Sequence, residues 1–527
     1  MNLNNLIEMK RINYLMGLAI TAMLFFTSCD DLLEEEPIDE ISTDYIYSSV
    51  DGIEVGVTAL YNRLRENNAT GRSGDGFRAN AFTLIATDLG QMRTFFTPYD
   101  PTRHNATLGF ANQKWVSGYQ IIDRANAIIT AAPNLEQNDR LEKLVAQARL
   151  IRGETYFDLL RMYSNILLDT IPTTADNYQD VVEYVPANQA DVYELIDSDF
   201  DYAITNLDYK EDFGRYNQAV ARHLKGKSAM WQGNWSEAAS QFDAIIEDGT
   251  YRLIELDKVF GQDLNHAEAI AVYPRDQALG DDDDLAGGDD IWYSSFFNNR
   301  YYELNSNEMI PSVELGGNSL GWGYPNDYLQ SLYDKDNDIR YTTYYYSTVL
   351  ISNNPNHPNF GNEITGYEDN FRRYHWSLKK YHDDEKPIGS NGNWKDYLYY
   401  RFAETLMLGA EAHWRADNEN PTSPKALEYI NKIRERAFGN TAHNFSEFTL
   451  ENYLEESARE LAFEKNRWYL LKRLGLLVER QNLHYRFGSN TGNNRPYPMA
   501  PHMVNWPIPQ AQLDIMGDSF PQNDGYE

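Results

Sequence analysis

Residues 219–251 read AVARHLKGKSAMWQGNWSEAASQFDAIIEDGTY, and this stretch decides the fold that we expect. The spacing of a tetratricopeptide helix–turn–helix, with small residues where two helices cross closely, is met by Gly226, Ala229, Ala238 and Phe242. Each hairpin of this type buries only one face and must stack on its neighbours. The pattern therefore predicts an α-solenoid.

A second hairpin of the same kind lies nearer the C-terminal end. Residues 398–417 and 423–437 repeat small and apolar residues at helical spacing, with a longer loop at 418–422. Helical periodicity also marks residues 44–66, 115–133, 139–165 and 191–207. The predicted fold class is mainly α, a tetratricopeptide-type scaffold of helical hairpins.

Residues 281–394 differ in composition from the helical blocks. They are dense in Gly, Asn and Tyr and lack helical periodicity, so we expect a loop-rich, minor-β insertion. The expected organisation is an N-terminal helical scaffold with ligand-site loops at 29–280, the insertion at 281–394, and helical hairpins with a Pro- and Asn-rich tail at 395–527. Residues 29–527 should together form one unit.

The chain begins with the parts of a secretory signal peptide, at residues 1–28. Lys10 and Arg11 precede the apolar run 15–26, which is about half as long as a membrane-spanning helix, and two small residues follow it. Cleavage there would make Cys29, the single cysteine, the first residue of the mature chain. Because a thiolate is the nucleophile for lipid attachment, we predict a lipoprotein rather than a buried, inert thiol.

The charge and the aromatic content restrict the partners. The formal net charge is −33 and the sequence pI is about 4.6, which disfavours nucleic acid and anionic lipid surfaces. Aromatic residues make up 13% of the chain, with 38 Tyr and 10 Trp. Core packing explains many of these rings, and a carbohydrate-binding surface would explain the rest.

Motifs for catalysis or metal binding are weak. Residues 316–321 contain G-x-S-x-G around Ser319, but Trp322 and Gly323 follow where a nucleophile elbow requires a helix. The acidic run 281–284 includes Asp282 and Asp283, which could supply oxygen ligands to calcium. A solvated acidic loop is the explanation that we favour, and no other cofactor is expected.

A pair of carboxylates raises the alternative of a glycoside hydrolase. Glu460 and Glu464 are one turn apart in a stretch with helical periodicity, at a separation that suits a retaining enzyme. Arg459 and Arg467 are expected beside them and would keep both acids ionised, whereas a general acid must hold its proton. We therefore interpret these groups as structural ion pairs and expect no enzymatic activity.

Loops that mix aromatic and polar side chains are the best candidates for a binding site. Ring faces stack on sugars, while polar groups hydrogen-bond the hydroxyls, and residues 91–105 and 292–324 have this composition. The predicted ligand-binding residues are Arg93, Phe96, Tyr99, Arg103, Asn105, Trp292, Tyr293, Tyr301, Trp322 and Tyr324. For any single ring, covering the scaffold is the alternative role.

Several stretches together carry a family resemblance. They are CDDLLEEEP (29–37), WVSGYQIIDRANAII (115–129), ARLIRGETYFDLLRMYSN (148–165), YRFAETLMLGAEA (400–412), ALEYINKIRERA (426–437), RELAFEKNRWYLLKR (459–473) and WPIPQAQLDIMGDSFPQNDGYE (506–527). In this order they resemble the motifs of the SusD/RagB family along almost the whole chain. Leu470 departs from that pattern, because Asp is usual there.

The resemblance implies a lipid-anchored protein without catalytic activity on the outer face of the outer membrane. It implies a lid on a SusC-type TonB-dependent transporter, which captures a glycan or, in some branches, a peptide. Three interpretations follow. We favour a glycan-binding lid; the alternatives are the same role for a peptide or another nutrient, and a glycoside hydrolase.

Overall fold

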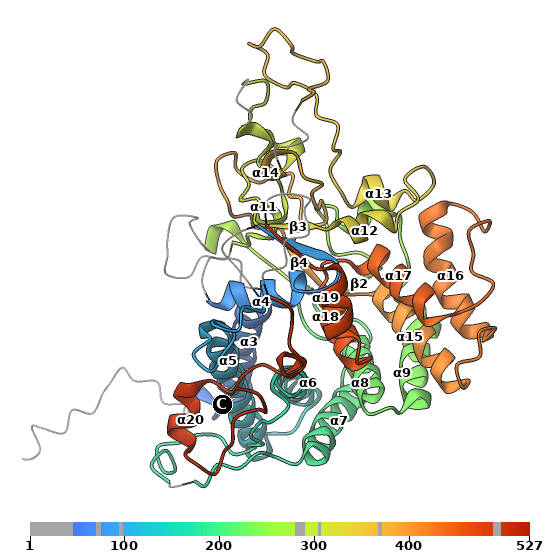
Figure 1. Ribbon diagram of the computed structural model, residues 1–527. Coiled ribbons are helices and arrows are strands. Elements are labelled where there is room, and N and C mark those ends of the chain that lie inside the picture. Colours follow the sequence, from blue (N-terminus) through green and yellow to red (C-terminus); the bar gives the residue numbers. More distant parts are fainter. Residues whose placement is uncertain are drawn as a thin grey trace, which may run out of the picture. The chain divides into compact units, whose positions relative to one another are not determined.

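Helices packed side by side form the scaffold of the protein (Figure 1). The computed structural model describes residues 46–69, 75–93, 98–180, 182–279, 290–303, 307–366, 371–488 and 497–526. The scaffold comprises α3 (Val50–Ala69), α4 (Asp75–Ile85), α5 (Gly109–Ala131), η2 (Ala132–Asn134), α6 (Asp139–Tyr163), α7 (Gln189–Asn206), α8 (Gln218–Trp231), α9 (Trp235–Asp248), α15 (Phe402–Ala416), α16 (Pro424–Phe438), α17 (Leu450–Leu461), α18 (Asn466–Arg473), α19 (Leu477–His484), η6 (Pro501–Val504) and α20 (Gln510–Met516). Contacts run successively from α5 through α6, α7, α8, α9 and α15 to α16. The mainly α, tetratricopeptide-type scaffold is therefore confirmed.

The α8–α9 hairpin has the geometry that its sequence predicts. Asn217 and Asn234 cap the two helices, each accepting a hydrogen bond from a backbone N–H of the first turn. The helices cross where Gly226 faces Phe242, and a Cβ built on Gly226 would lie only 2.6 Å from the ring. The small residue is required there because any side chain would push the two helices apart.

We expect Gly226→Ala to lower the free energy of unfolding by about 1–3 kcal/mol, although alanine is the better helix former. The added methyl would overlap the Phe242 ring, which is fully buried. Thermal denaturation of the variant measures the effect. The double variant Gly226→Ala/Phe242→Leu should recover part of the loss, and an equal or larger loss in the double variant would contradict this account.

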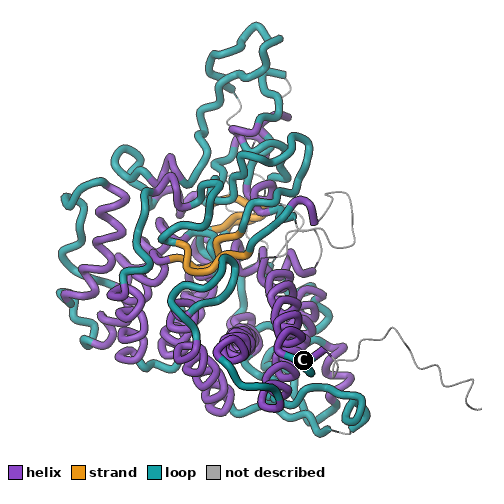
Figure 2. The backbone as a smooth tube through the Cα atoms, turned by 180° about the vertical axis from the view of Figure 1, so that it is seen from behind, coloured by secondary structure: helices purple, strands orange, loops and turns teal. Residues whose placement is uncertain are grey.

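The long insertion leaves the scaffold after α9 and returns before α15. Its two ends are joined by strands β2 (Ala269–Tyr273) and β4 (Tyr397–Arg401), which pair antiparallel. Figure 2 shows loops dominating this part, above the helices and next to the strands. Helix α10 (Leu256–Val259) precedes β2. Between the two strands lie η3 (Gln277–Leu279), α11 (Tyr293–Phe297), η4 (Tyr301–Glu303), η5 (Val313–Leu315), β3 (Gly323–Pro325), α12 (Asp327–Ser331), α13 (Arg340–Thr343) and α14 (Phe371–Tyr374).

A small sheet connects the insertion to the scaffold. Strand β1 (Gly90–Met92) lies in its centre and pairs antiparallel with β3, with Gly90 opposite Pro325 and Met92 opposite Gly323. On its other side β1 pairs parallel with β5 (Arg486–Phe487). Three segments far apart in sequence therefore meet at one place.

The insertion is loop-rich, as expected, and its helices of about one turn are too short to show periodicity. One local expectation is wrong, because the segment carrying Glu460 and Glu464 is not one helix. Helix α17 ends at Leu461, and the chain then turns through Phe463 and Lys465, both with positive φ, before α18 begins.

The C-terminal tail packs over the first helices, as its composition predicts. Trp506 is fully buried, and its backbone N–H donates to the carbonyl oxygen of Met162 at 2.8 Å. The Asn523 side chain donates to the carbonyl oxygens of Tyr163 and Trp506, at 2.6 and 2.8 Å. These bonds close the C-terminal end of α6, whose last carbonyls have no partner within the helix.

Candidate functional site

The β1–β3 pair positions the first two candidate residues. The backbone N–H of Arg93, directly after β1, donates to the carbonyl oxygen of Trp322 at 2.9 Å. The Arg93 side chain donates through Nε to the carbonyl oxygen of Gly321, also at 2.9 Å. Arg93 and Trp322 are both partly exposed. Arg93 is therefore anchored through its backbone to Trp322 and through its guanidinium group to the residue before it, at the end of the β1–β3 pair.

Trp292 lies next to Trp322 although it comes from a different segment. The two ring centroids are 6.4 Å apart and the ring planes are inclined by 52°. Trp292 precedes α11, and its indole N–H donates to Oδ2 of the buried Asp290 at 2.8 Å. Both indoles pack against the core yet stay partly exposed. Together they form what we call the tryptophan platform, an apolar surface with polar groups at its edge.

A buried lysine supports the loop that carries Trp322. The Lys386 ammonium group donates to the Ser295 hydroxyl and to the carbonyl oxygens of Gly316 and Asn318, at 2.7, 3.0 and 2.6 Å. Burial lowers the pKa of Lys386 to about 7. Ser319, in the same loop, is buried and its hydroxyl donates to the carbonyl oxygen of Asn299. The chain continues from Ser319 into β3, so the G-x-S-x-G sequence is part of a structural turn.

Four of the predicted binding tyrosines are buried instead of exposed. Their exposed fractions are 0–2%, and they are Tyr99, Tyr293, Tyr301 and Tyr324. The hydroxyl of Tyr99 donates to the carbonyl oxygen of Ala86 at 2.7 Å. A ligand cannot stack on these ring faces without opening the core, so these tyrosines pack the interior of the protein.

The remaining candidates lie elsewhere or outside the described residues. Arg103 is exposed and pairs with Asp100, with 3.8 Å between Nε and Oδ2. The Asn105 side chain bonds to Thr102 and Thr107 and stabilises its own turn. Phe96, Asp282, Asp283 and Cys29 lie outside the described residues. Of the predicted residues, the structure therefore brings together Arg93, Trp292 and Trp322.

Sequence reasoning missed two further arginines beside the platform. Arg300 and Arg372 join Arg93 around Tyr324, and we call these three residues the arginine cluster. The carbonyl oxygen of Arg372 accepts a hydrogen bond from the Arg300 backbone N–H at 2.9 Å. Glu303 pairs with both Arg300 and Arg372. The Arg–Arg doublet at 372–373 was the one signal in the sequence that could have indicated this cluster.

Glu460, a candidate acid for hydrolysis, is held in a buried ion-pair network. Its carboxylate is fully buried and lies 3.0, 2.8 and 2.6 Å from nitrogens of Arg340, Arg401 and Arg436. Burial alone would raise the pKa of Glu460, but the three guanidinium groups lower it below its usual value. A carboxylate held ionised in this way cannot serve as a general acid.

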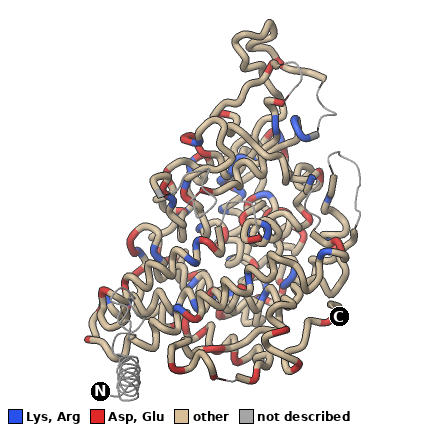
Figure 3. Tube along the Cα trace, turned by 90° about the vertical axis from the view of Figure 1, so that its left-hand side faces the viewer, with Lys and Arg blue, Asp and Glu red and all other residues tan. Residues whose placement is uncertain are grey.

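Figure 3 shows basic segments mostly inside the trace and acidic segments frequent along its lower edge.

Glu464 is also ion-paired, although its partners differ from those expected. It accepts from Lys380 and Arg401, each at 2.6 Å. The expectation that Arg459 and Arg467 neutralise Glu460 and Glu464 is wrong, because α17 breaks between the two acids. Arg459 instead pairs with Glu456 at 2.9 Å, and Arg467 with Asp88 at 2.6 Å.

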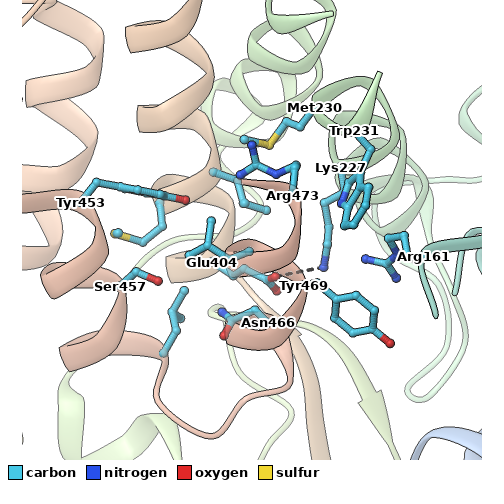
Figure 4. Close-up of a pocket in the computed structure, with 14 residues that line it drawn as sticks. Arg161, Lys227, Met230, Trp231, Glu404, Tyr453, Ser457, Asn466, Tyr469 and Arg473 are labelled. Carbon is cyan, nitrogen blue, oxygen red and sulfur yellow. Dashed lines mark hydrogen bonds and ion pairs between the residues drawn. The ribbon is translucent and has the colours of Figure 1, made fainter. Parts of the chain in front are cut away.

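A small cavity lies inside the scaffold, between α8, α15, α17 and α18 (Figure 4). Lys227 and Glu404 face each other across it, with 3.0 Å between the charged groups. Burial would raise the pKa of Glu404, but the charge of Lys227, with a smaller contribution from His223, lowers it to about 2. The volume of about 40 Å³ holds a few water molecules at most, far below the roughly 300 Å³ of a small-ligand pocket. This cavity is therefore part of the scaffold.

Among the helices of the described ranges, none is long and apolar enough to cross a membrane. In the same part of the chain, no group of three or more His, Cys, Asp or Glu side chains has the arrangement of a metal site.

Comparisons with known proteins agree on one family. A model of the SusD family matches residues 257–526, and a model described as "Starch-binding associating with outer membrane" matches residues 72–221. The chain is 23% identical over 548 residues to SusD-like protein P25 of Formosa agariphila, covering 95% of this chain and 97% of that protein.

Solved structures share the fold. A SusD homolog from Bacteroides thetaiotaomicron superimposes with a TM-score of 0.73 at 18% identity, covering 93% of this chain and 99% of that chain. Surface glycan-binding protein A of the same species, solved in complex with laminarihexaose, gives a TM-score of 0.68 at 20% identity, covering 89% and 98%. The similarity extends over nearly the full length of both of these structures.

Proposed function

Because the chain belongs to the SusD family, we propose that it is a cell-surface lipoprotein that captures glycans and delivers them to a SusC-type TonB-dependent transporter in the outer membrane. The observation that carries the proposal is the pair of partly exposed indoles, Trp292 and Trp322, held 6.4 Å apart beside Arg93. Such a surface can stack on successive sugar rings while a guanidinium group binds their hydroxyls.

The relatives support a carbohydrate ligand. One structure that shares the fold was solved in complex with laminarihexaose, and one of the two matching family models is described as starch-binding. The mode of action that we propose is binding without hydrolysis, because Glu460 and Glu464, the best acid pair of the sequence, are engaged by arginine and lysine.

Calorimetry of the purified protein against a panel of polysaccharides tests the glycan part. Binding to at least one polysaccharide, without release of new reducing ends, is the expected result. If no polysaccharide of the panel bound and peptides did, the ligand would be a peptide and not a glycan. New reducing ends would indicate a hydrolase.

The lipid anchor is tested at Cys29, which we propose as the acylated residue. Wild-type protein should incorporate radiolabelled palmitate and fractionate with the outer membrane, whereas Cys29→Ser should remain unlabelled and leave the membrane fraction. Trp322→Ala is the matched control, because it leaves the N-terminal signal intact and should be labelled like the wild type. Unlabelled wild-type protein recovered from the cytosol would contradict the proposal.

A further inference from the structure

The arginine cluster is a local excess of positive charge in a chain whose formal net charge is −33. Glu303 is shared by Arg300, Arg372 and Arg373, with 3.7 and 4.0 Å to the last two. Arg93 directs its Nε to a carbonyl oxygen and not to a carboxylate. In the described part of the chain, Glu303 is the one carboxylate that pairs with any residue of the arginine cluster, so positive charge is left over beside the tryptophan platform.

These arginines are not freely solvated surface groups. The side chains of Arg300 and Arg372 are only 27% and 32% exposed, and the Nε atom of each is buried without a hydrogen-bond partner. Burial, followed by the charges of Arg93 and Arg300, lowers the pKa of Arg372. Partly desolvated like charges repel one another, which raises the electrostatic energy of the ligand-free protein. An anion bound among the arginines would remove this repulsion.

The cluster is also contiguous with the platform. A Cβ on Gly321 would lie 3.5 Å from Cγ of Arg372, and the same glycine accepts the Nε hydrogen bond of Arg93. Arg93 and Arg372 thus both contact Gly321, the residue before Trp322. A sugar stacked on Trp322 would bring its substituents within reach of these guanidinium groups.

We propose that the glycan bound at the tryptophan platform is anionic, and that the arginine cluster receives its sulfate or carboxylate groups. This inference rests on the proposed function and narrows its ligand class. Planar guanidinium groups form paired, charge-assisted hydrogen bonds with such anions, and these bonds are stronger than those to neutral hydroxyls. The acidic remainder of the protein does not oppose binding at contact distance, because salt screens charges beyond about 8–10 Å.

Calorimetry with three oligosaccharides of equal length tests the inference: laminarihexaose, which is neutral, a hexagalacturonate, which carries carboxylates, and a sulfated galactan hexasaccharide. The wild-type protein should bind one or both anionic probes about 10-fold or more tightly than the neutral one. Which anionic probe binds distinguishes carboxylate from sulfate. Raising the NaCl concentration from about 50 mM to about 0.5 M should remove most of this preference.

Two variants locate the effect. Arg372→Gln and, independently, Arg300→Gln should weaken the anionic probe about 10- to 100-fold and leave laminarihexaose binding within about 2-fold. Arg372→Lys should restore part of the affinity. Arg63→Gln on α3 is the matched control, because it removes the same charge from an exposed pair with Glu66 and should change nothing.

The outcomes separate the two proposals. Equal or tighter binding of the neutral probe by the wild type would overturn the anionic ligand and leave glycan capture standing. Anionic binding unaffected by both arginine variants would also overturn it, because the anion would then bind elsewhere. Failure of the wild type to bind any glycan would overturn the proposed function and this inference with it.

Discussion

Replacing Trp322 by alanine is expected to weaken glycan binding about 30-fold, the equivalent of about 2 kcal/mol. The indole is partly exposed, lies next to Trp292 and is held by the β1–β3 pair, so its position is already fixed before the ligand arrives. A preformed aromatic surface loses little conformational entropy on binding, which is why its removal costs so much. Calorimetric titration of the variant with the best polysaccharide ligand measures the change.

The same substitution should leave the scaffold folded. Trp322 packs at the edge of the core, whereas Trp468 and Trp506 lie fully inside it. The matched control is Trp235→Ala on α9, where a partly buried indole contacts Arg415 and Arg473 far along the chain from the platform. It should bind glycan like the wild type. Equal losses of affinity in both variants, or a large loss of thermal stability in Trp322→Ala, would mean that the ring belongs to the core.

Replacing Glu460 by glutamine is expected to lower the free energy of unfolding by about 3–5 kcal/mol. The fully buried carboxylate compensates Arg340, Arg401 and Arg436, and glutamine would leave three guanidinium groups without their central counter-charge. The network need not stabilise the fold more than an apolar cluster would. Each arginine keeps another carboxylate partner, so the cost comes from the buried positive charge that Glu460 no longer compensates. Urea denaturation is the suitable measurement, because guanidinium chloride would screen the network under test.

Glu428→Gln provides the comparison for that variant. Glu428 pairs with Lys432 one turn away on α16 at 2.8 Å, and both side chains are more than 40% exposed. The same change of charge should cost less than about 1 kcal/mol there, because solvent already screens the pair. If the two variants shifted the urea midpoint equally, the buried network would not be the source of the stability.

Local patterns predicted the scaffold well because its determinants are local. Gly226 and Phe242 are close in sequence, and their spacing alone indicates where α8 and α9 cross. The break after Leu461 has no such signal, since Phe463 and Lys465 adopt positive φ without a glycine or proline to announce it. The helical periodicity of the sequence continues across the break and therefore predicted one continuous helix. For that reason Arg459 and Arg467 were wrongly expected to neutralise Glu460 and Glu464.

The candidate site was harder to predict because it is assembled from distant segments. Composition indicated the loops that carry Trp292 and Trp322, but it could not separate these rings from Tyr293 and Tyr324, which lie one or two residues away. Which ring faces solvent depends on the pairing of β1 with β3, and that pairing joins segments far apart in the chain. The arginine cluster has the same origin, since Arg93, Arg300 and Arg372 become neighbours only in the folded protein.

The contact between α9 and α15 has a consequence for how the protein matures. The two helices are adjacent in the stack, although the entire insertion separates them along the chain. During synthesis, the side of α9 that α15 covers in the folded protein therefore stays exposed. It is covered only when the residues after 401 have been synthesised and the β2–β4 pair has closed the intervening loop. A nascent chain that stopped short of that point would present an apolar surface to chaperones and proteases, so quality control would act on the first half until the second half arrives.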